Sequence, residues 1–116
     1  MTMIKIIRLP RLPAGHRPRV ADQIIDARAQ VRLEVRAIIR TTETITVGSS
    51  PAYRCEISDG TGEINLIFLG RATIPGLWAG RYCVVEGMVG TYGGTLAVWN
   101  PRYQIMPAAH ELEQET

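Results

Sequence analysis

The stretch Asp59-Gly60-Thr61-Gly62 decides the fold. It separates two strand-like runs, residues 53–58 and 63–69, in which apolar and polar side chains alternate. An Asp-Gly pair between such runs is a strong hairpin signal, because glycine adopts the positive φ that a tight turn needs. Similar glycines recur through the chain that follows, at positions 76, 80, 87, 90, 93 and 94. This punctuation leaves no room for long helices, so we predict an antiparallel barrel or sandwich.

The composition is that of one ordinary globular domain. The chain has 116 residues, of which 46% are hydrophobic and 21% charged, enough for a modest core. No apolar run reaches the ~18 residues of a membrane span, and Arg8 and Pro10 interrupt the short apolar N-terminus. We therefore expect no signal peptide, no membrane and a cytoplasmic location. Cys55 and Cys83 lack metal-like spacing and are expected as buried free thiols, with a disulfide as the alternative.

Charge is distributed unevenly along the sequence. Residues 1–40 hold nine Lys and Arg against three Asp and Glu, whereas residues 41–116 hold four against eight. Twelve of the thirteen basic residues are arginine, which a GC-rich genome would also produce. The uneven distribution favours an electrostatic footprint formed by a basic arm and one basic strand. We expect a Pro-rich flexible or extended arm over residues 1–19, a domain over 20–106 and an acidic tail over 107–116.

Period-two alternation supplies the strands. In the first, odd-numbered aliphatic residues from Val31 to Ile39 should face the core, and even-numbered residues, among them Arg32, Arg36 and Arg40, should face water. Pro75-Gly76 limits the third connection to a short turn or one helical turn around residues 71–74. The predicted strands cover residues 31–47, 53–58, 63–69, 81–89 and 95–103.

Three motifs carry a resemblance: DGTG-x-I-x-L-x-F at 59–68, G-x-x-x-x-V-E-G-x-V-G at 80–90, and G-G-x-L-x-V-x-N-P-x-Y at 93–103. With five strands and glycines at the corners, the region 24–105 resembles small bacterial OB-fold nucleic-acid-binding proteins of the actinobacterial type. It is also similar to the wedge OB domain of RecG-type branched-DNA helicases and, more distantly, to the anticodon-binding barrel of class II aminoacyl-tRNA synthetases. The chain departs from this pattern at Val35 and Ala37, where such domains usually carry a glycine, and in its basic arm.

The resemblance implies an all-β, five-stranded OB-fold Greek-key barrel that binds nucleic acid on its outer face. Such a face combines cationic groups with aromatic platforms, although alternating polar residues also occur on any solvated barrel wall. Tyr53 and Phe68 have inward parity and should be core, and Trp78 should cover a barrel end. The candidate binding residues are Arg32, Arg36, Arg40, Arg54, Asn65, Arg71, Tyr92 and Trp99. We expect Arg54 to lie beside the stripe formed by the three arginines of the first strand, and Tyr92 to stand in the loop between strands four and five.

A second outward set is apolar and indicates an interface. Tyr82, Val84 and Met88 on strand four should adjoin Ala97 and Trp99 on strand five. The N-terminal residues 4–7 could cover this patch, or a second copy could, giving a homodimer. Trp99 belongs to both hypotheses.

Catalysis finds little support in the sequence. His16 and His110 fall in the arm and the tail, and the sequence contains no catalytic triad, metal-ligand cluster or phosphate loop. We therefore predict a non-enzymatic module without cofactors that binds single-stranded or branched nucleic acid with little sequence preference. DNA is favoured, and RNA stays open because no residue reports recognition of a 2′-hydroxyl. The alternative is a protein-interaction or homo-oligomerisation module that does not bind nucleic acid directly.

Overall fold

The structure is a computed structural model that describes residues 22–107. The arm expected over residues 1–19, and the acidic residues of the expected tail, lie outside the described part of the chain.

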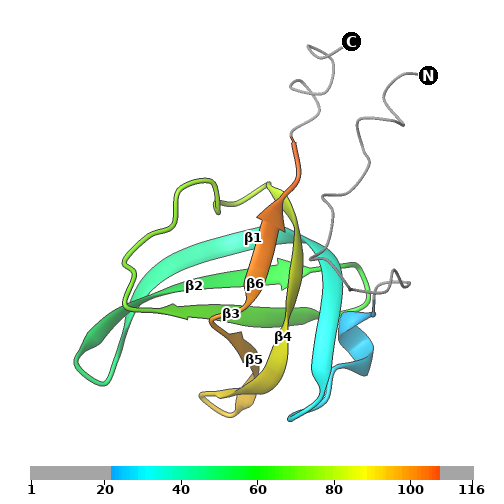
Figure 1. The fold of residues 1–116 in the computed structure, drawn as a ribbon, viewed down its shortest axis with the longest axis horizontal. Coiled ribbons are helices and arrows are strands. Elements are labelled where there is room, and N and C mark those ends of the chain that lie inside the picture. Colours follow the sequence, from blue (N-terminus) through cyan, green and yellow to red (C-terminus); the bar gives the residue numbers. More distant parts are fainter. Residues whose placement is uncertain (1–21, 108–116) are drawn as a thin grey trace.

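The described chain forms one six-stranded sheet that closes on itself (Figure 1). The strands follow the order β1-β2-β3-β5-β4-β6, and an additional pairing between β1 and β4 completes a ring of the first five. The elements are η1 (Ile24–Asp26), β1 (Arg32–Val47), β2 (Ser50–Ser58), β3 (Glu63–Leu69), β4 (Tyr82–Tyr92), β5 (Thr95–Trp99) and β6 (Arg102–Ile105).

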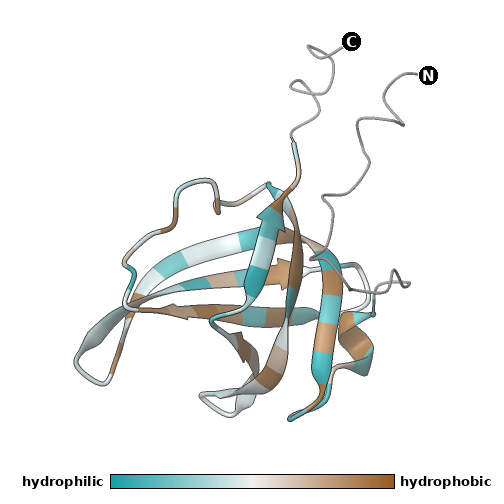
Figure 2. Cartoon of the chain, viewed as in Figure 1, coloured by the Kyte–Doolittle hydropathy of each residue, from teal (hydrophilic) through white to brown (hydrophobic). Residues whose placement is uncertain are grey.

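Strand β1 is long enough to belong to two walls of the barrel. Its residues 32–38 pair with β4, and its residues 38–47 pair with β2. A register shift between Ile39 and Thr41 marks a β-bulge at Arg40, a device that bends a strand. Figure 2 shows hydrophobic and hydrophilic bands alternating along the first half of β1. The predicted inward positions 33, 35, 37 and 39 are buried, whereas Val31 precedes the strand and is exposed.

This is the predicted OB-fold, with one refinement at its C-terminal end. The fifth predicted strand divides at Asn100-Pro101, because Asn100 takes a positive φ of 50° and Pro101 cannot donate a backbone hydrogen bond. Asn100 also ties this break to β3: its N–H donates to Ile67 O at 2.7 Å, and its Oδ1 accepts from Leu69 N at 2.9 Å. The chain after the break becomes β6, which pairs with β4.

The connection between β3 and β4 closes one end of the barrel. It contains turns at Pro75-Gly76 and no helical turn over 71–74. Leu77 is fully buried, and its carbonyl accepts a 2.6 Å hydrogen bond from the hydroxyl of buried Tyr53. Trp78, expected as the lid, is instead exposed, with the guanidinium of Arg81 5.6 Å from its ring centroid. The lid is therefore Leu77, one residue earlier.

Both cysteines are buried free thiols, as expected. Burial raises the pKa of Cys55 to about 12, although the nearby Arg54 opposes the rise. Burial likewise raises the pKa of Cys83 to about 12, with Cys55 adding to the effect. These thiols remain protonated at neutral pH and act as small apolar core groups.

The Asp59 turn fastens the beginning of the domain to the barrel. Asp59 accepts hydrogen bonds from the backbone N–H of Ile24 at 2.9 Å, and from the N–H and hydroxyl of Thr61 at 2.9 and 2.6 Å. Ile24 is thereby packed into the main core cluster. Ile25, the next residue, is exposed, because consecutive residues of this short turn point in different directions.

We expect the Asp59→Asn substitution to remove a pH-dependent part of the stability. Burial alone would raise the pKa of Asp59, but hydrogen bonds from the Thr61 hydroxyl and from backbone N–H groups outweigh it and lower the pKa below 3.8. A carboxyl whose pKa is depressed in the folded state stabilises above its unfolded pKa, and the contribution disappears as pH falls through the folded value. Urea unfolding should therefore show a loss of about 1 kcal/mol at pH 7 that shrinks below pH 3.8.

The matched control is Glu63→Gln, which removes an exposed carboxylate from the other side of the same turn. It should not reproduce this pH dependence. If Asp59→Asn lowers the free energy of unfolding equally at pH 7 and below pH 3.8, the assigned role of the carboxylate is wrong.

Candidate nucleic-acid interface

Two hairpins flank the outer face of the barrel formed by β2, β3 and β5. One turns at residues 48–49 between β1 and β2, and the other at residues 93–94 between β4 and β5 (Figure 1). Between them the register aligns one row of outward positions: Glu43 pairs with Arg54, Arg54 with Ile67, and Ile67 with Trp99. We call this surface the groove face. It brings together residues that are far apart in the sequence.

The floor of the groove face is apolar. Ala52, Ile67 and Ala97 are fully buried although they point away from the main core, and they form a second hydrophobic cluster. Half-buried side chains from β1, β4 and β5 pack around them, namely Ile45, Val47, Tyr92 and Trp99. The cluster gives the face a rigid apolar base, on which exposed ring surface can meet a flat ligand.

Trp99 is held in place on this floor. Its Nε1–H donates to Thr91 O at 2.9 Å, and its ring meets Tyr92 edge-on, with centroids 5.9 Å apart. A Cβ at Gly90 would lie 3.3 Å from Cδ1 of the indole, so glycine leaves the room that the ring occupies. Trp99 and Tyr92 thus form a fixed aromatic pair, and Tyr92 ends β4 rather than standing in the loop.

Arg54 is oriented by two neighbours. Its Nη1 donates to Asn65 Oδ1 at 2.8 Å, and its Nη2 pairs with Glu43 Oε1 at 2.5 Å. The Asn65 amide thus uses its oxygen as the acceptor for Arg54. A guanidinium fixed in this way offers a flat surface for stacking, whereas its charge is largely neutralised by Glu43.

The predicted arginine stripe is split by closure of the barrel. Arg32 and Arg36 lie where β1 pairs with β4, opposite Met88 and Val84. Arg54 lies opposite Glu43 and not beside them, which corrects the expected arrangement. Arg40 occupies the bulge near Glu56, one row from Arg54 on the β1–β2 wall. The three arginines of β1 therefore lie on two different walls of the barrel, and only Arg40 is next to the groove face.

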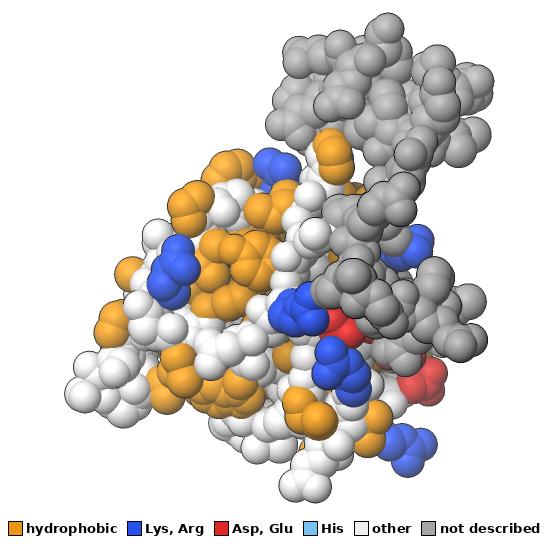
Figure 3. All heavy atoms as spheres, in the orientation of Figure 1, with side chains coloured by type: hydrophobic (Ala, Val, Ile, Leu, Met, Phe, Trp, Pro, Cys, Tyr) orange, Lys and Arg blue, Asp and Glu red, His pale blue; other side chains and the backbone are white. Residues whose placement is uncertain are grey.

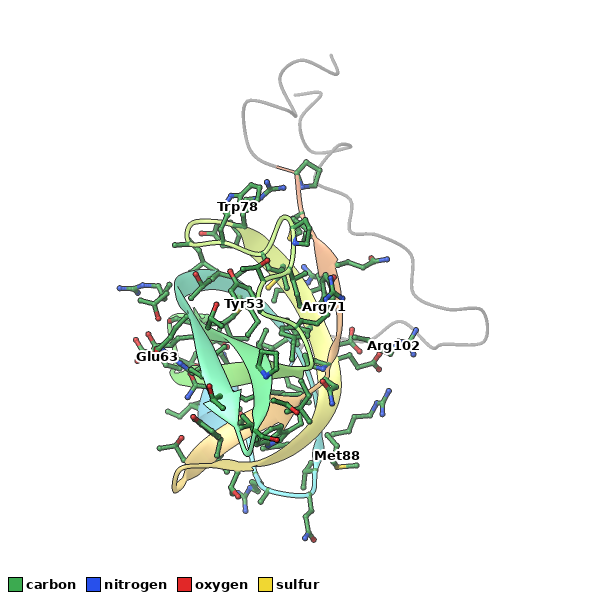
Figure 4. The ribbon with its side chains drawn as sticks, turned by 90° about the vertical axis from the view of Figure 1, so that its left-hand side faces the viewer. Tyr53, Glu63, Arg71, Trp78, Met88 and Arg102 are labelled. Atoms are coloured by element: carbon green, nitrogen blue, oxygen red, sulfur yellow. The ribbon has the colours of Figure 1, made fainter. Side chains whose placement is uncertain are left out.

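Arg71 lies at the rim of the barrel, two residues after the end of β3. The N–H of Gly70 donates to Pro51 O at 2.8 Å, beside the β1–β2 hairpin, and Arg71 follows immediately. Its neighbour Ala72 accepts a 2.7 Å bond from the Thr44 hydroxyl of β1. In Figure 4 Trp78 lies at the opposite end of the barrel from Met88, and Arg71 lies between them, at the height of Tyr53.

The predicted apolar patch on β4 is not continuous. Tyr82 and Met88 are 56% and 55% exposed, but Val84 between them is buried. The 83–86 part of β4 pairs with β6 rather than β5, because the fifth predicted strand is divided; Ala97 is buried in the groove floor and Trp99 lies over it. A separate group of hydrophobic side chains gathers between β6 and the β3–β4 connection (Figure 3). Tyr103 of β6 meets Phe68 of β3 edge-on, with ring centroids 5.5 Å apart.

Sequence reasoning did not single out several residues of the groove face, among them Glu43, Ile67 and Gly90. Strand alternation alone predicts that Ile67 faces solvent, because its parity is outward. Glu43 follows the bulge in β1. A bulge reverses which residues, odd or even, face outward, and the pattern of apolar and polar residues does not reveal where that reversal occurs. Gly90 was read only as turn punctuation, although its missing Cβ makes room for an indole.

Comparison with known proteins shows the fold. The second OB-fold domain of replication protein A from Methanococcus maripaludis, solved by NMR, matches with a TM-score of 0.58 and 13% identity, over 76% of this chain and 96% of that one. A replication protein A heterotrimer bound to single-stranded DNA matches with a TM-score of 0.49 and 17% identity, over 81% and 78% of the two chains. No protein-family profile and no curated sequence matches the chain.

Two further findings concern residues 22–107. No group of three or more His, Cys, Asp or Glu side chains there is placed to hold a metal ion. No helix in that range has the length and apolarity needed to cross a membrane.

Proposed function

We propose that this OB-fold binds single-stranded nucleic acid through the groove face, without catalysis. The observation that carries the proposal is the alignment of Arg54, Asn65 and Trp99 on one outer face between two hairpins. Aromatic rings and a flat guanidinium supply stacking surfaces, each worth about 1–3 kcal/mol per base, and they accept any base. Low sequence preference follows from this mode of binding.

In this proposal other arginines contact the phosphates. Arg40 and Arg71 are exposed and make no side-chain hydrogen bond or ion pair within residues 22–107. Arg32 and Arg54, by contrast, are engaged by Glu86 and Glu43. Charges that are not already neutralised release counterions when they meet phosphates, so Arg40 and Arg71 are the electrostatic contacts that we assign.

The ligand and setting are proposed from the sequence motifs as well. The resemblance to RecG-type wedge domains and small bacterial OB-fold proteins adds branched DNA to the proposed ligands and favours DNA over RNA. In this proposal a barrel over residues 20–106 acts in the cytoplasm, between a basic arm and an acidic tail.

Titration of a fluorescent single-stranded oligonucleotide at several salt concentrations tests the proposal. The Arg40→Ala/Arg71→Ala variant should bind more weakly, and its slope of log K against log salt should be shallower by about 1.4, since each contact on a single strand contributes about 0.7. The matched control is Arg32→Ala/Arg36→Ala, which removes the same charge from the other wall and should leave the slope nearer the wild-type value.

If the protein at concentrations up to about 10⁻⁴ M does not bind the oligonucleotide at low salt, the proposal is wrong. Equal losses in the two double variants would place the contacts elsewhere. The alternative, an interaction module, rests on the exposed side chains of Tyr82 and Met88 on β4. It is favoured if the protein fails to bind and light scattering gives the mass of a dimer.

A further inference from the structure

Strand β6 has a neighbour on only one side. Among the strands of the described chain it pairs with β4 alone, whereas β1, at the other end of the strand order, pairs with both β2 and β4. Closure of the barrel thus leaves one long side of β6 unpaired. An unpaired strand edge presents a row of N–H and C=O groups to which another strand can bond.

The hydrogen-bond pattern identifies the residues that face the open side. The N–H of Met106 donates to Tyr82 O at 2.8 Å, and in an antiparallel pair such bonded positions recur at every second residue. Gln104 therefore bonds to β4, and the backbone groups of Tyr103 and Ile105 point away from it. No hydrogen bond from another described element reaches these two positions.

The two faces of β6 differ in character. Tyr103 and Ile105 lie on the inner face, where Tyr103 meets Phe68 edge-on and Ile105 packs against the main core cluster. Arg102 and Gln104 lie on the outer face and are exposed. A strand that added to this edge would continue both faces, so apolar and polar side chains should alternate along it.

The surroundings of the open edge are basic. The two segments that border it, residues 70–81 and 102–107, hold three arginines and no Asp or Glu. The side chain of Arg102 is 62% exposed and lies 3.8 Å from Glu86, whose carboxylate already receives Arg32 at 2.9 Å. Figure 4 shows Arg102 projecting from the side of the barrel. Its charge therefore faces solvent, and an acidic partner complements it.

Charge also decides between a partner strand and a second copy of this chain. If two β6 strands paired about a two-fold axis at Gln104, so that their open positions bonded to each other, Arg102 of one copy would lie opposite Met106 of the other. The guanidinium of Arg81 donates to Met106 O at 3.4 Å, so like charges would meet at both ends of the pairing. A nucleic acid lacks the alternating N–H and C=O groups that a strand edge bonds. An extended acidic peptide satisfies both the edge and its charge.

We propose that the open edge of β6 binds an extended acidic segment of another protein, which adds to the sheet as a strand beside Tyr103 and Ile105. Its apolar side chains extend the inner face, and its carboxylates lie on the outer face beside Arg102. Main-chain hydrogen bonds supply the affinity, and the two faces select the alternating sequence. This surface is separate from the groove face, so the inference does not depend on nucleic-acid binding.

Amide hydrogen exchange and peptide titration test the proposal. The probes are a short synthetic peptide in which Asp and Val alternate, and its counterpart in which Lys replaces Asp. In the protein alone the amide of Tyr103 should exchange rapidly, whereas that of Gln104 is protected by its bond to β4. The Asp–Val peptide, at about ten times its Kd, should slow exchange at Tyr103 about tenfold. Fluorescence anisotropy at low salt should show that it binds at least about tenfold more tightly than the Lys–Val peptide.

Two substitutions at one position separate the backbone edge from the side chain. Tyr103→Pro removes the open N–H and no bond to β4, and proline is tolerated at such edge positions. Tyr103→Ala keeps that N–H and is the matched control. The proline variant should bind the Asp–Val peptide about fivefold more weakly than the alanine variant, the effect of losing about one backbone hydrogen bond.

Arg102→Gln changes no backbone group, so it tests the proposal even where the proline variant fails to fold. It should weaken binding of the Asp–Val peptide several-fold, because the carboxylates lose their partner on the outer face. Arg28→Gln removes an exposed arginine from the segment between η1 and β1 and should leave the affinity unchanged.

Four outcomes would overturn the proposal. They are no binding of the Asp–Val peptide at about 1 mM, equal affinity for the two peptides, equal affinity of the proline and alanine variants, and no response to Arg102→Gln. Displacement of the peptide by a single-stranded oligonucleotide would overturn it too, because the edge would then accept any polyanion. A dimer that Tyr103→Pro dissociates would place a second copy there instead. Oligonucleotide binding to the groove face is measured separately, so each proposal can fail without the other.

Discussion

Replacing Trp99 with alanine is expected to weaken single-stranded oligonucleotide binding by about tenfold to a hundredfold, since a stacked base contributes about 1–3 kcal/mol. The effect should be large because the ring is already immobilised by Thr91 and Tyr92, and a preorganised contact loses little entropy on binding. Fluorescence anisotropy at fixed low salt measures the change. The salt slope should stay at the wild-type value, because no charge is removed.

The chain offers a matched control in its other tryptophan. Trp78 is exposed on the β3–β4 connection, away from the groove face, so Trp78→Ala should alter binding by less than a factor of about two. Trp99→Phe should retain part of the affinity, since a smaller ring still stacks. A folded Trp99→Ala protein that binds like the wild type would show that the groove face is not the binding surface.

Replacing Ile67 with alanine is expected to destabilise the barrel by about 2–4 kcal/mol, the range for truncating a buried aliphatic side chain. Strand alternation alone would class this residue as solvent-facing, where substitutions change stability by about 0.5 kcal/mol or less. In the structure its exposure is 0%, because Ala52, Ala97 and their neighbours enclose it. Urea unfolding at neutral pH measures the difference.

Met88→Ala is the control for this prediction. Met88 has the same outward parity but is exposed on β4, so its truncation should cost no more than about 0.5 kcal/mol. A similarly small cost for Ile67→Ala would mean that the second hydrophobic cluster does not form. The groove face would then lack its apolar floor.

The fold could be predicted because its signals are local. The Asp59-Gly60 turn and the alternation around it specify the β2–β3 hairpin, and the pattern from Leu33 to Ile39 specifies which side of β1 is buried. Each of these depends on neighbours in the sequence, and strand pairing follows once the turns are placed.

The arrangement of the candidate site could not be predicted in full, because it depends on long-range pairing. The bulge at Arg40 transfers β1 from one neighbour to another, which separates Arg32 and Arg36 from Arg54. The break at Asn100 likewise places β6, and not the strand that carries Trp99, beside residues 83–86 of β4. Alternation tells which face a side chain occupies on its own strand, but not which strand lies beside it.

Because β1 pairs with both β2 and β4, the protein should fold slowly. Three hairpins join neighbouring segments, but the ring is completed only when groups such as Arg32 and Glu86, 54 positions apart, come together. Loop-closure entropy opposes that last encounter until its contacts are made. Refolding should therefore take milliseconds to seconds, the range of small β-barrels, rather than the microseconds of helical bundles.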